Sequence, residues 1–163
     1  MTIPPAGYPL RLAPVSIRSL AIAFAPERAG DADVRARPAR VLVVEDDYFV
    51  SMEVEAVLLD LGCDVIALAP TAEEALSIAA RERPDLILMD IRLAGRMDGI
   101  EAATRIHHEL GIRSLFVTAH SDPGTFARGE AANPFGWVRK PFTTHQLTAA
   151  VMAVLRPTDE PGV

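Results

Sequence analysis

The sequence predicts a doubly wound α/β domain, in which helices cover both faces of a five-stranded parallel sheet. Five short aliphatic or β-branched runs alternate with five stretches of helical periodicity over about 117 residues. Such alternation implies right-handed crossovers between parallel strands. The chain has 163 residues, of which 50% are apolar, so it is long enough for one domain with a core but not for two.

The strands are predicted from short runs of residues that favour extended backbone. We expect them in the spatial order 2-1-3-4-5, with the first and third strands as neighbours. The five predicted strands are VLVV at 41–44, DVIAL at 64–68, LILM at 86–89, SLFVT at 114–118 and FGWVRK at 135–140.

The helices between them are predicted from apolar periodicity and from signals at their ends. Gly62 ends the first helix, Thr71 and Glu74 have capping-box spacing at the start of the second, and Gly111 ends the third. The fourth contains two glycines and precedes an Asn-Pro pair, so we expect it to be short. The predicted helices extend over residues 50–61, from 71 to a stop at 84, and over 99–110, 123–131 and 144–155.

Residues 1–39 are predicted to be an irregular extension, because they contain six prolines and no sustained helical period. Their apolar run at residues 20–25 is too short for a secretory signal, which needs about 7 to 15 apolar residues. A start codon assigned too early would explain the extension, and an intact mass that begins at Met1 would exclude this. We place the domain at residues 40–157 and a short tail at 158–163.

Composition excludes several classes of function. Residues 1–39 carry five arginines and three acids, so the net charge of −6 leaves −8 for the remainder, which would repel nucleic acid. No run of roughly 18 apolar residues exists to span a membrane. The single cysteine, Cys63, cannot form an intramolecular disulfide, which fits a reducing cytoplasm, and we expect its side chain to be buried.

Acidic residues follow two strands that we expect to be neighbours. Glu45 and Asp46 end the first strand, and Asp90 ends the third. In doubly wound sheets ligands bind at the carboxyl ends of the strands, so the three carboxylates should converge there. Because such carboxylates raise each other's pKa, a divalent cation would stabilise the group, and hard oxygen ligands favour Mg²⁺. The next acid, Asp47, is better explained as a helix N-cap.

A hydroxyl and an ammonium complete the predicted pocket. Thr118 ends the fourth strand, and Lys140, the only lysine beside fifteen arginines, ends the fifth. Together they suit a phosphoryl group, to which threonine donates a hydrogen bond and lysine offers a compact charge. A carboxylate beside Mg²⁺ and a lysine can act as a nucleophile and form an aspartyl phosphate. Each residue alone has an ordinary structural explanation, whereas their conjunction is specific.

These motifs resemble the receiver domains of two-component response regulators, which have a flavodoxin-like fold. VLVVEDD, LILMD, the MDG of residues 97–99, LFVTAH and the KPF of residues 140–142 stand in the family's order. The resemblance implies that Asp90 is the phosphoacceptor, Asp46 a direct Mg²⁺ ligand and Glu45 a ligand through water. The backbone carbonyl of Arg92 would also bind the metal.

The resemblance also implies that Thr118 and Lys140 contact the phosphoryl group and that the Lys140-Pro141 peptide bond is cis. Trp137 stands where the family has a switch aromatic, which turns inward as the threonine moves. A plain packing role is the alternative for Trp137. Arg92 and His120 would flank the phosphoryl group and tune dephosphorylation, or His120 is simply exposed.

The sequence departs from the common family pattern at two places. The loop of residues 91–99 lacks the common Met-Pro, and NPF replaces the Ala-Gly pair that usually precedes the switch aromatic, which puts the standard signalling face in doubt. Three further histidines are expected on helix surfaces: His107, His108 and His145.

The predicted function is that of a stand-alone response regulator in the cytoplasm, not an enzyme. It would receive a phosphoryl group from a sensor histidine kinase or a His-phosphotransfer protein, and then bind a downstream protein or serve as a phosphorelay intermediate or sink. A homodimer through helix 4, strand 5 and helix 5 is a further hypothesis. It is based on Leu147, Ala150, Val151, Val154 and Leu155 of the last helix. Two alternatives remain open: a degenerate receiver that binds without phosphorylation, and an aspartyl-nucleophile phosphohydrolase.

Overall fold

A parallel sheet in the order β2-β1-β3-β4-β5 forms the centre of the domain, as the sequence predicts. The computed structural model describes residues 37–120 and 122–155. Each predicted strand is present, with ends that differ by at most one residue from the expected ones. The strands are β1 (Arg40–Val44), β2 (Asp64–Ala69), β3 (Leu86–Met89), β4 (Ser114–Thr118) and β5 (Gly136–Arg139).

Backbone hydrogen bonds continue beyond the strand ends and align the residues that follow them. The amide of Glu45 donates to the carbonyl of Ala69 at 3.0 Å, and the amide of Asp90 donates to that of Val44 at 2.9 Å. On the other side of the sheet, the amide of Lys140 donates to the carbonyl of Thr118 at 2.9 Å. The polar residues at the carboxyl ends of the strands are therefore held by the sheet itself.

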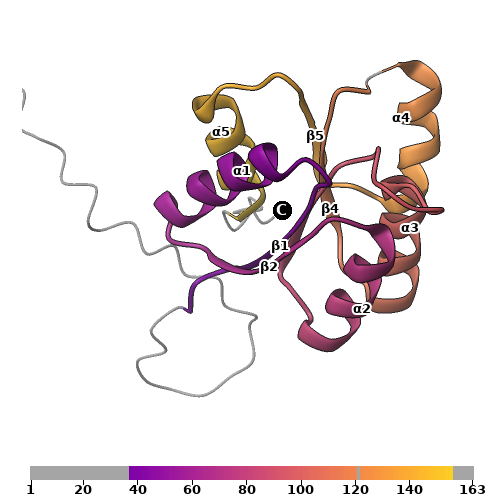
Figure 1. Cartoon of the computed structure of the whole chain (residues 1–163), viewed down its shortest axis with the longest axis horizontal. Helices are drawn as coiled ribbons and strands as arrows, with labels where there is room; N and C mark the ends of the chain where they lie inside the picture. Colours follow the sequence, from indigo (N-terminus) through magenta and orange to yellow (C-terminus); the bar gives the residue numbers. More distant parts are fainter. Residues whose placement is uncertain (1–36, 121, 156–163) are drawn as a thin grey trace, which may run out of the picture.

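The helices cover both faces of the sheet, with α1 and α5 on one face and α2, α3 and α4 on the other (Figure 1). Successive strand residues point to opposite faces and join two separate cores. Leu42 and Phe116 pack towards α2 and α3, whereas Val43 and Val117 pack towards α1 and α5. The helices are α1 (Tyr48–Asp60), α2 (Ala72–Glu82), α3 (Gly99–Leu110), α4 (Pro123–Gly129) and α5 (Thr144–Leu155).

Side-chain caps fix where the helices begin. Asp47 accepts hydrogen bonds from the first amides of α1, and Thr71 accepts one from the amide of Glu74 in α2, so both predicted caps are confirmed. Asp98 and Asp122 cap α3 and α4 in the same way. Each cap also sets where the loop before its helix ends.

Helix α4 is short, as expected from its glycines. It has seven residues and passes into a 3₁₀ turn, η2 (Glu130–Ala132). Asn133 then adopts a left-handed conformation with a φ of 45°, which ends the turn before β5. Gly129, the last residue of α4, is buried.

The predicted extension lies largely outside the described residues, and so do the questions of a secretory signal and of the start at Met1. Of residues 1–39 only 37–39 are described. The guanidinium of Arg37 contacts both carboxylate oxygens of Asp85, at 2.7 and 2.8 Å, and the carbonyl of Ala39 accepts from the amide of Asp64 at 2.8 Å. The predicted tail at 158–163 is also undescribed, and the boundaries at 40 and 157 stay predictions.

The expectation for Cys63 is confirmed, whereas the one for the histidines is confirmed only in part. Cys63 is buried as expected, and burial raises the pKa of its thiol. His108 and His145 are exposed, but His107 is half-buried, because α3 turns it partly towards the core. Within 37–120 and 122–155, no helix has both the length and the apolar composition needed to cross a bilayer.

Candidate functional site

Three carboxylates converge at the carboxyl edge of the sheet, as predicted. Glu45 and Asp46 follow β1 and Asp90 follows its neighbour β3, and carboxylate oxygens of the three residues lie within 4.8 Å of one another. Glu45 and Asp90 are 6% and 7% exposed, whereas Asp46 is open to solvent. The cluster thus has two buried carboxylates and one exposed carboxylate at the opening of the site.

Lys140 crosses from the end of β5 to this cluster. Its ammonium nitrogen lies 2.8 Å from Oδ2 of Asp90 and 2.5 Å from Oε2 of Glu45. The lysine side chain is only 16% exposed. Because both partners are buried carboxylates, the three charges form one compact unit in a partly dehydrated pocket.

Burial has opposite effects on the pKa values of Glu45 and Lys140. Burial raises the pKa of Glu45 above its ordinary value; the hydrogen bond from Lys140 opposes this, and the neighbouring charge of Asp90 adds to it. Burial alone would lower the pKa of Lys140, but hydrogen bonds to Asp90 and Glu45 outweigh it and raise that pKa. Lys140 is therefore held in its charged form.

The loop after Asp90 folds back against its own start. One carboxylate oxygen of Asp90 accepts from the amide of Ile91 at 2.6 Å, and the amide of Gly99 donates to the carbonyl of Ile91 at 2.8 Å. A Cβ atom at Gly99 would lie 1.8 Å from the backbone oxygen of Asp90. The glycine of the MDG motif is therefore required by close backbone approach, a role that sequence reasoning did not assign.

Thr118 and the Lys140-Pro141 bond are placed as expected. Thr118 is buried at the end of β4, and its hydroxyl accepts a hydrogen bond from the amide of His120 at 3.2 Å. The Lys140-Pro141 peptide bond is cis, which confirms that prediction. His120 is half-buried, and both interpretations of this residue stay predictions.

A hollow of about 380 Å³ adjoins the site and contains the two predicted flanking residues, Arg92 and His120. Its walls come from the loop after β3 and from the start of α4. The side chain of Arg92 is exposed. Sequence reasoning did not identify the other polar residues of the hollow, which are Arg96, Asp98, Asp122, Thr125 and Arg128.

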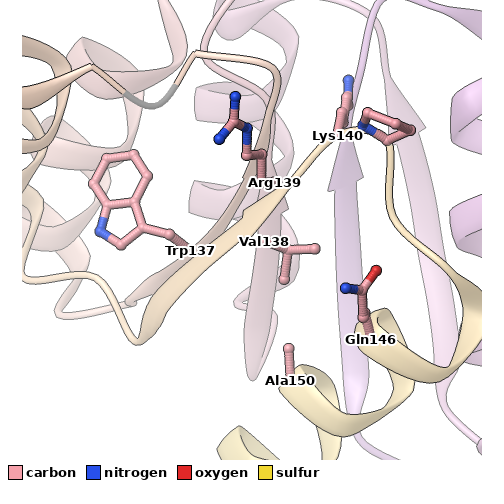
Figure 2. A pocket seen from close by; sticks show the side chains of 7 residues that line it. Trp137, Val138, Arg139, Lys140, Gln146 and Ala150 are labelled. Carbon is pink, nitrogen blue, oxygen red and sulfur yellow. The ribbon is translucent and has the colours of Figure 1, made fainter.

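Trp137 does not lie among these polar residues. Trp137 and Val138 point to opposite faces of β5 (Figure 2), and the indole packs on the face of α3 and α4. It stacks on Phe116 with ring centroids 4.4 Å apart and meets the edge of Phe126 at 4.6 Å. This geometry agrees with the packing interpretation of Trp137.

The acidic site fits a magnesium ion. Two buried carboxylates and one exposed carboxylate supply hard oxygen ligands on one side, and the open mouth at Asp46 leaves room for water. Arg92 lies two residues beyond Asp90, where its backbone carbonyl is the expected further ligand. The oxygen ligands of the site thus match the Mg²⁺ site predicted from the sequence.

A doubly wound sheet with an acidic cluster and a lysine at its carboxyl edge defines a receiver domain. Residues 41–152 match the response regulator receiver domain family. This chain is therefore a member of that family. The family match gives no support to the alternative of a phosphohydrolase with its nucleophile on the first strand.

Relatives of known name agree with this assignment. The chain is 34% identical over 116 residues to the phyllosphere-induced regulator PhyR of Methylorubrum extorquens, a match that covers 71% of this chain and 43% of PhyR. It is 33% identical over 127 residues to the transcriptional regulatory protein PdtaR of Mycobacterium tuberculosis, covering 77% and 61%. The chain thus spans about half the length of these relatives.

Solved structures show the same fold. The receiver domain of a modulated diguanylate cyclase from Desulfovibrio desulfuricans superimposes with a TM-score of 0.67 at 34% identity, covering 72% of this chain and 94% of that one. A putative response regulator from Chloroflexus aurantiacus gives 0.66 at 30% identity, covering 72% and 98%.

Proposed function

We propose that this response regulator accepts a phosphoryl group on Asp90 from a sensor histidine kinase or a His-phosphotransfer protein. The observation that carries the proposal is the contact of Lys140 with Asp90 beside two further carboxylates at one sheet edge. Signalling would then follow by binding of a downstream protein, or by passage of the phosphoryl group along a phosphorelay. The chain assists its own phosphorylation and dephosphorylation and has no other catalytic role.

The transfer step uses Oδ2 of the Asp90 carboxylate, the oxygen that Lys140 contacts, because Oδ1 accepts a hydrogen bond from the amide of Ile91. That oxygen attacks phosphorus in line, a P–O bond forms, and the P–N bond of the donor's phosphohistidine breaks with its electron pair going to the imidazole nitrogen. Lys140 holds the carboxylate in place before transfer and can contact a phosphoryl oxygen afterwards. The hydroxyl of Thr118, at the end of the next strand, would donate to another phosphoryl oxygen.

Asp46, Asp90 and the backbone carbonyl of Arg92 would hold Mg²⁺ directly, and Glu45 would do so through water. When bound, the ion neutralises negative charge on the phosphoryl oxygens. In its absence the ammonium of Lys140 is the positive charge in contact with the buried acids Glu45 and Asp90.

Helix α1 offers a surface for the phosphate donor. Its first turn lies directly after Asp46 and Asp47 and exposes Tyr48 and Phe49, with Phe49 81% exposed. Met52 continues this surface at 45% exposed. Large apolar side chains exposed together mark interaction sites, and a partner bound here would stand beside the Asp90 pocket. We therefore assign this end of α1 to the histidine-bearing protein.

The output surface is assigned to a groove of about 520 Å³ between β5 and α5, which begins at Lys140 and Pro141 and runs past Gln146 to Ala150 (Figure 2). A downstream protein is the proposed occupant, and a homodimer through α4, β5 and α5 is the alternative. The apolar side chains of α5 give less support to a dimer than expected, because Leu147 and Val151 are buried in the core of one subunit. Mass by light scattering, with and without phosphorylation, distinguishes the two.

The proposed phosphorylation is tested with the full chain, Mg²⁺ and a small acyl phosphate such as acetyl phosphate. We expect the intact mass to rise by one phosphoryl group in a base-labile form, and Asp90→Asn to abolish this. Asp60→Asn, at an exposed acid at the far end of α1, is the matched control and should label normally. Label that persists in Asp90→Asn would refute the assigned nucleophile.

The degenerate receiver, which binds without phosphorylation, remains the second candidate function. An unlabelled wild type under these conditions would favour it. The cytoplasmic location also stays a proposal, consistent with a phosphate donor that acts from inside the cell.

A further inference from the structure

The loop that follows β3 is closed at its base and anchored at two points near the site. The amide of Gly99 donates to the carbonyl of Ile91, which closes residues 91–99 into one loop. Ile91 is 5% exposed and Leu93 is half-buried, and both pack against the core beneath α2 and α3. Arg92, whose carbonyl is the expected further metal ligand, is exposed between them. Two apolar side chains therefore anchor the backbone on either side of that carbonyl.

The middle of the loop lies against the start of α2. Ala94 forms an isolated parallel β-bridge with Thr71, the N-cap of α2. Gly95, the next residue, has a φ of 119°, which residues other than glycine rarely adopt. A Cβ atom placed on it would lie 3.2 Å from Oε2 and 3.7 Å from Oε1 of Glu73. The carboxylate of Glu73 thus covers Gly95 and leaves little room for a side chain there.

The segment that joins β2 to α2 also contacts the other part of the acidic site. The carbonyl of Ala69 accepts a hydrogen bond from the amide of Glu45 at 3.0 Å. Two residues later Thr71 pairs with Ala94, and Pro70 between them restricts the backbone. One short segment therefore contacts both stretches of chain that carry the proposed Mg²⁺ ligands.

From these contacts we propose that the start of α2 positions the metal site, because Thr71 and Glu73 hold the loop so that the carbonyl of Arg92 is in place when Mg²⁺ binds. The inference rests on the proposed function in taking this sheet edge as a Mg²⁺ site. Thr71 and Glu73 are positioning residues that act through the loop. A loop that is already ordered binds its ligand more tightly, and by reciprocity Mg²⁺ should stabilise the start of α2.

The affinity of the full chain for Mg²⁺ tests the proposal. Gly95→Ala should weaken Mg²⁺ binding about tenfold, as is typical when residues that orient metal ligands are changed. Isothermal titration calorimetry at a temperature where the variant is folded measures this.

Gly62→Ala is the matched control. Gly62 also has a positive φ, 78°, and its Cβ would have no neighbour within 4 Å among the described residues. This variant should lose stability through the same backbone strain but keep the Mg²⁺ affinity of wild type. Unchanged affinity in Gly95→Ala, or an equal loss of affinity in both variants, would overturn the proposal.

An exposed residue of α2 gives a second test that needs no strained backbone. Glu73→Ala removes the carboxylate that covers Gly95 and should weaken Mg²⁺ binding about threefold, less than Gly95→Ala because the backbone at residue 95 stays relaxed. Glu73→Gln keeps a side chain of the same length and should keep the affinity of wild type. An equal loss in Glu73→Ala and Glu73→Gln would assign the effect to charge and would overturn the proposal.

Amide exchange in α2, measured by NMR, reports whether Thr71 stays in place. The amide of Glu74 donates to Oγ1 of Thr71 at 3.2 Å, and the amide of Ala75 donates to the carbonyl of Thr71 at 3.1 Å. In the metal-free protein Gly95→Ala should speed exchange of these two amides about tenfold, because the loop no longer supports the cap.

The start of α5 serves as the control within the same molecule. Thr143 accepts hydrogen bonds from the amides of Gln146 and Leu147 in the same way, at 3.2 and 3.1 Å. Exchange of these amides should not change in Gly95→Ala. Faster exchange to the same extent at both helix starts would indicate general destabilisation and would refute the link between the loop and α2.

Addition of Mg²⁺ separates this inference from the proposed function. In wild type Mg²⁺ should slow exchange of the amides of Glu74 and Ala75, and in Gly95→Ala it should do so less. Mg²⁺ binding without slower exchange at these amides would overturn the inference and leave the metal site intact. A wild type that binds no Mg²⁺ would count against the proposed function, while exchange in the metal-free variants would still decide whether α2 holds the loop.

Discussion

The ammonium of Lys140 lies 2.8 Å from Asp90 and 2.5 Å from Glu45, so one positive charge bridges two buried carboxylates. Lysine suits this position because its three donors surround a compact charge on a narrow stem. The chain uses arginine at its other fifteen strongly basic positions. The planar guanidinium group of arginine is wider than the ammonium group of lysine. It would not fit as well in this pocket, where the lysine side chain is only 16% exposed.

Lys140→Arg should therefore keep Mg²⁺ binding within a few-fold of wild type and slow phosphorylation of Asp90. We expect labelling by acetyl phosphate to be about tenfold to a hundredfold slower, the effect of losing one well-placed charged hydrogen bond. Arg139→Lys, the reverse change at the neighbouring exposed position, is the control and should label at the wild-type rate. Normal labelling of Lys140→Arg, or normal signalling by it, would contradict the argument.

Asp46→Asn should separate metal binding from folding. Without Mg²⁺ the substitution relieves repulsion with Glu45 and Asp90, so we expect the free energy of unfolding to rise slightly, by about 0.5 kcal/mol for this exposed group. With Mg²⁺ the wild type should gain stability, and the variant should need about tenfold more Mg²⁺ for the same gain.

Thermal unfolding over a Mg²⁺ titration measures both effects. Asp47→Asn is the control, because asparagine also caps helices and residue 47 serves as the cap of α1. An equal response to Mg²⁺ in Asp46→Asn and Asp47→Asn would remove Asp46 from the site.

Asp85 should make stability depend on pH at the opposite edge of the sheet. Burial alone would raise the pKa of Asp85, but hydrogen bonds from Arg37 and from the amide of Arg40 outweigh it and lower the pKa. Because the pKa is lower in the folded state, ionised Asp85 stabilises the fold above its ordinary pKa. That contribution is lost as pH falls through the lower, folded value.

Asp85→Asn should thus cost about 1 to 2 kcal/mol of unfolding free energy near pH 7, and the difference from wild type should shrink as the pH falls through the lowered pKa of Asp85. Urea unfolding at several pH values measures this. For Asp60→Asn the difference should be small at every pH, because this exposed acid has no ion-pair partner in residues 37–120 and 122–155. A difference for Asp85→Asn that grows on acidification would have the wrong sign.

The sheet and the acidic site were predictable because both follow from short-range patterns. Strands and caps have local signatures, and the strand order brings Glu45 and Asp90 together once β1 and β3 are neighbours. The environment of Trp137 was not predictable in this way. Its neighbours Phe116, Phe126 and Gly129 come from two other elements, and a glycine that weakens a helix pattern gives no sign that it accommodates an indole.

The role of Gly99 was likewise not predictable from the sequence. Its replacement is a strict test of the loop geometry at the site. Gly99→Ala would place a methyl group 1.8 Å from the backbone oxygen of Asp90, so the loop or the end of β3 must shift. We expect a loss of about 1 to 3 kcal/mol in unfolding free energy, as for other overpacked sites.

The shift also moves the residue that is proposed to be phosphorylated, so Gly99→Ala should label with acetyl phosphate more slowly even at temperatures where it is fully folded. Circular dichroism establishes the folded fraction, and intact mass measures the label. Gly124→Ala, a glycine in α4 whose Cβ would meet only a side-chain oxygen, should label normally. If Gly99→Ala were as stable and as readily labelled as wild type, the close approach of residue 99 to Asp90 would not exist in solution. The chain would then not need glycine after the cap of α3.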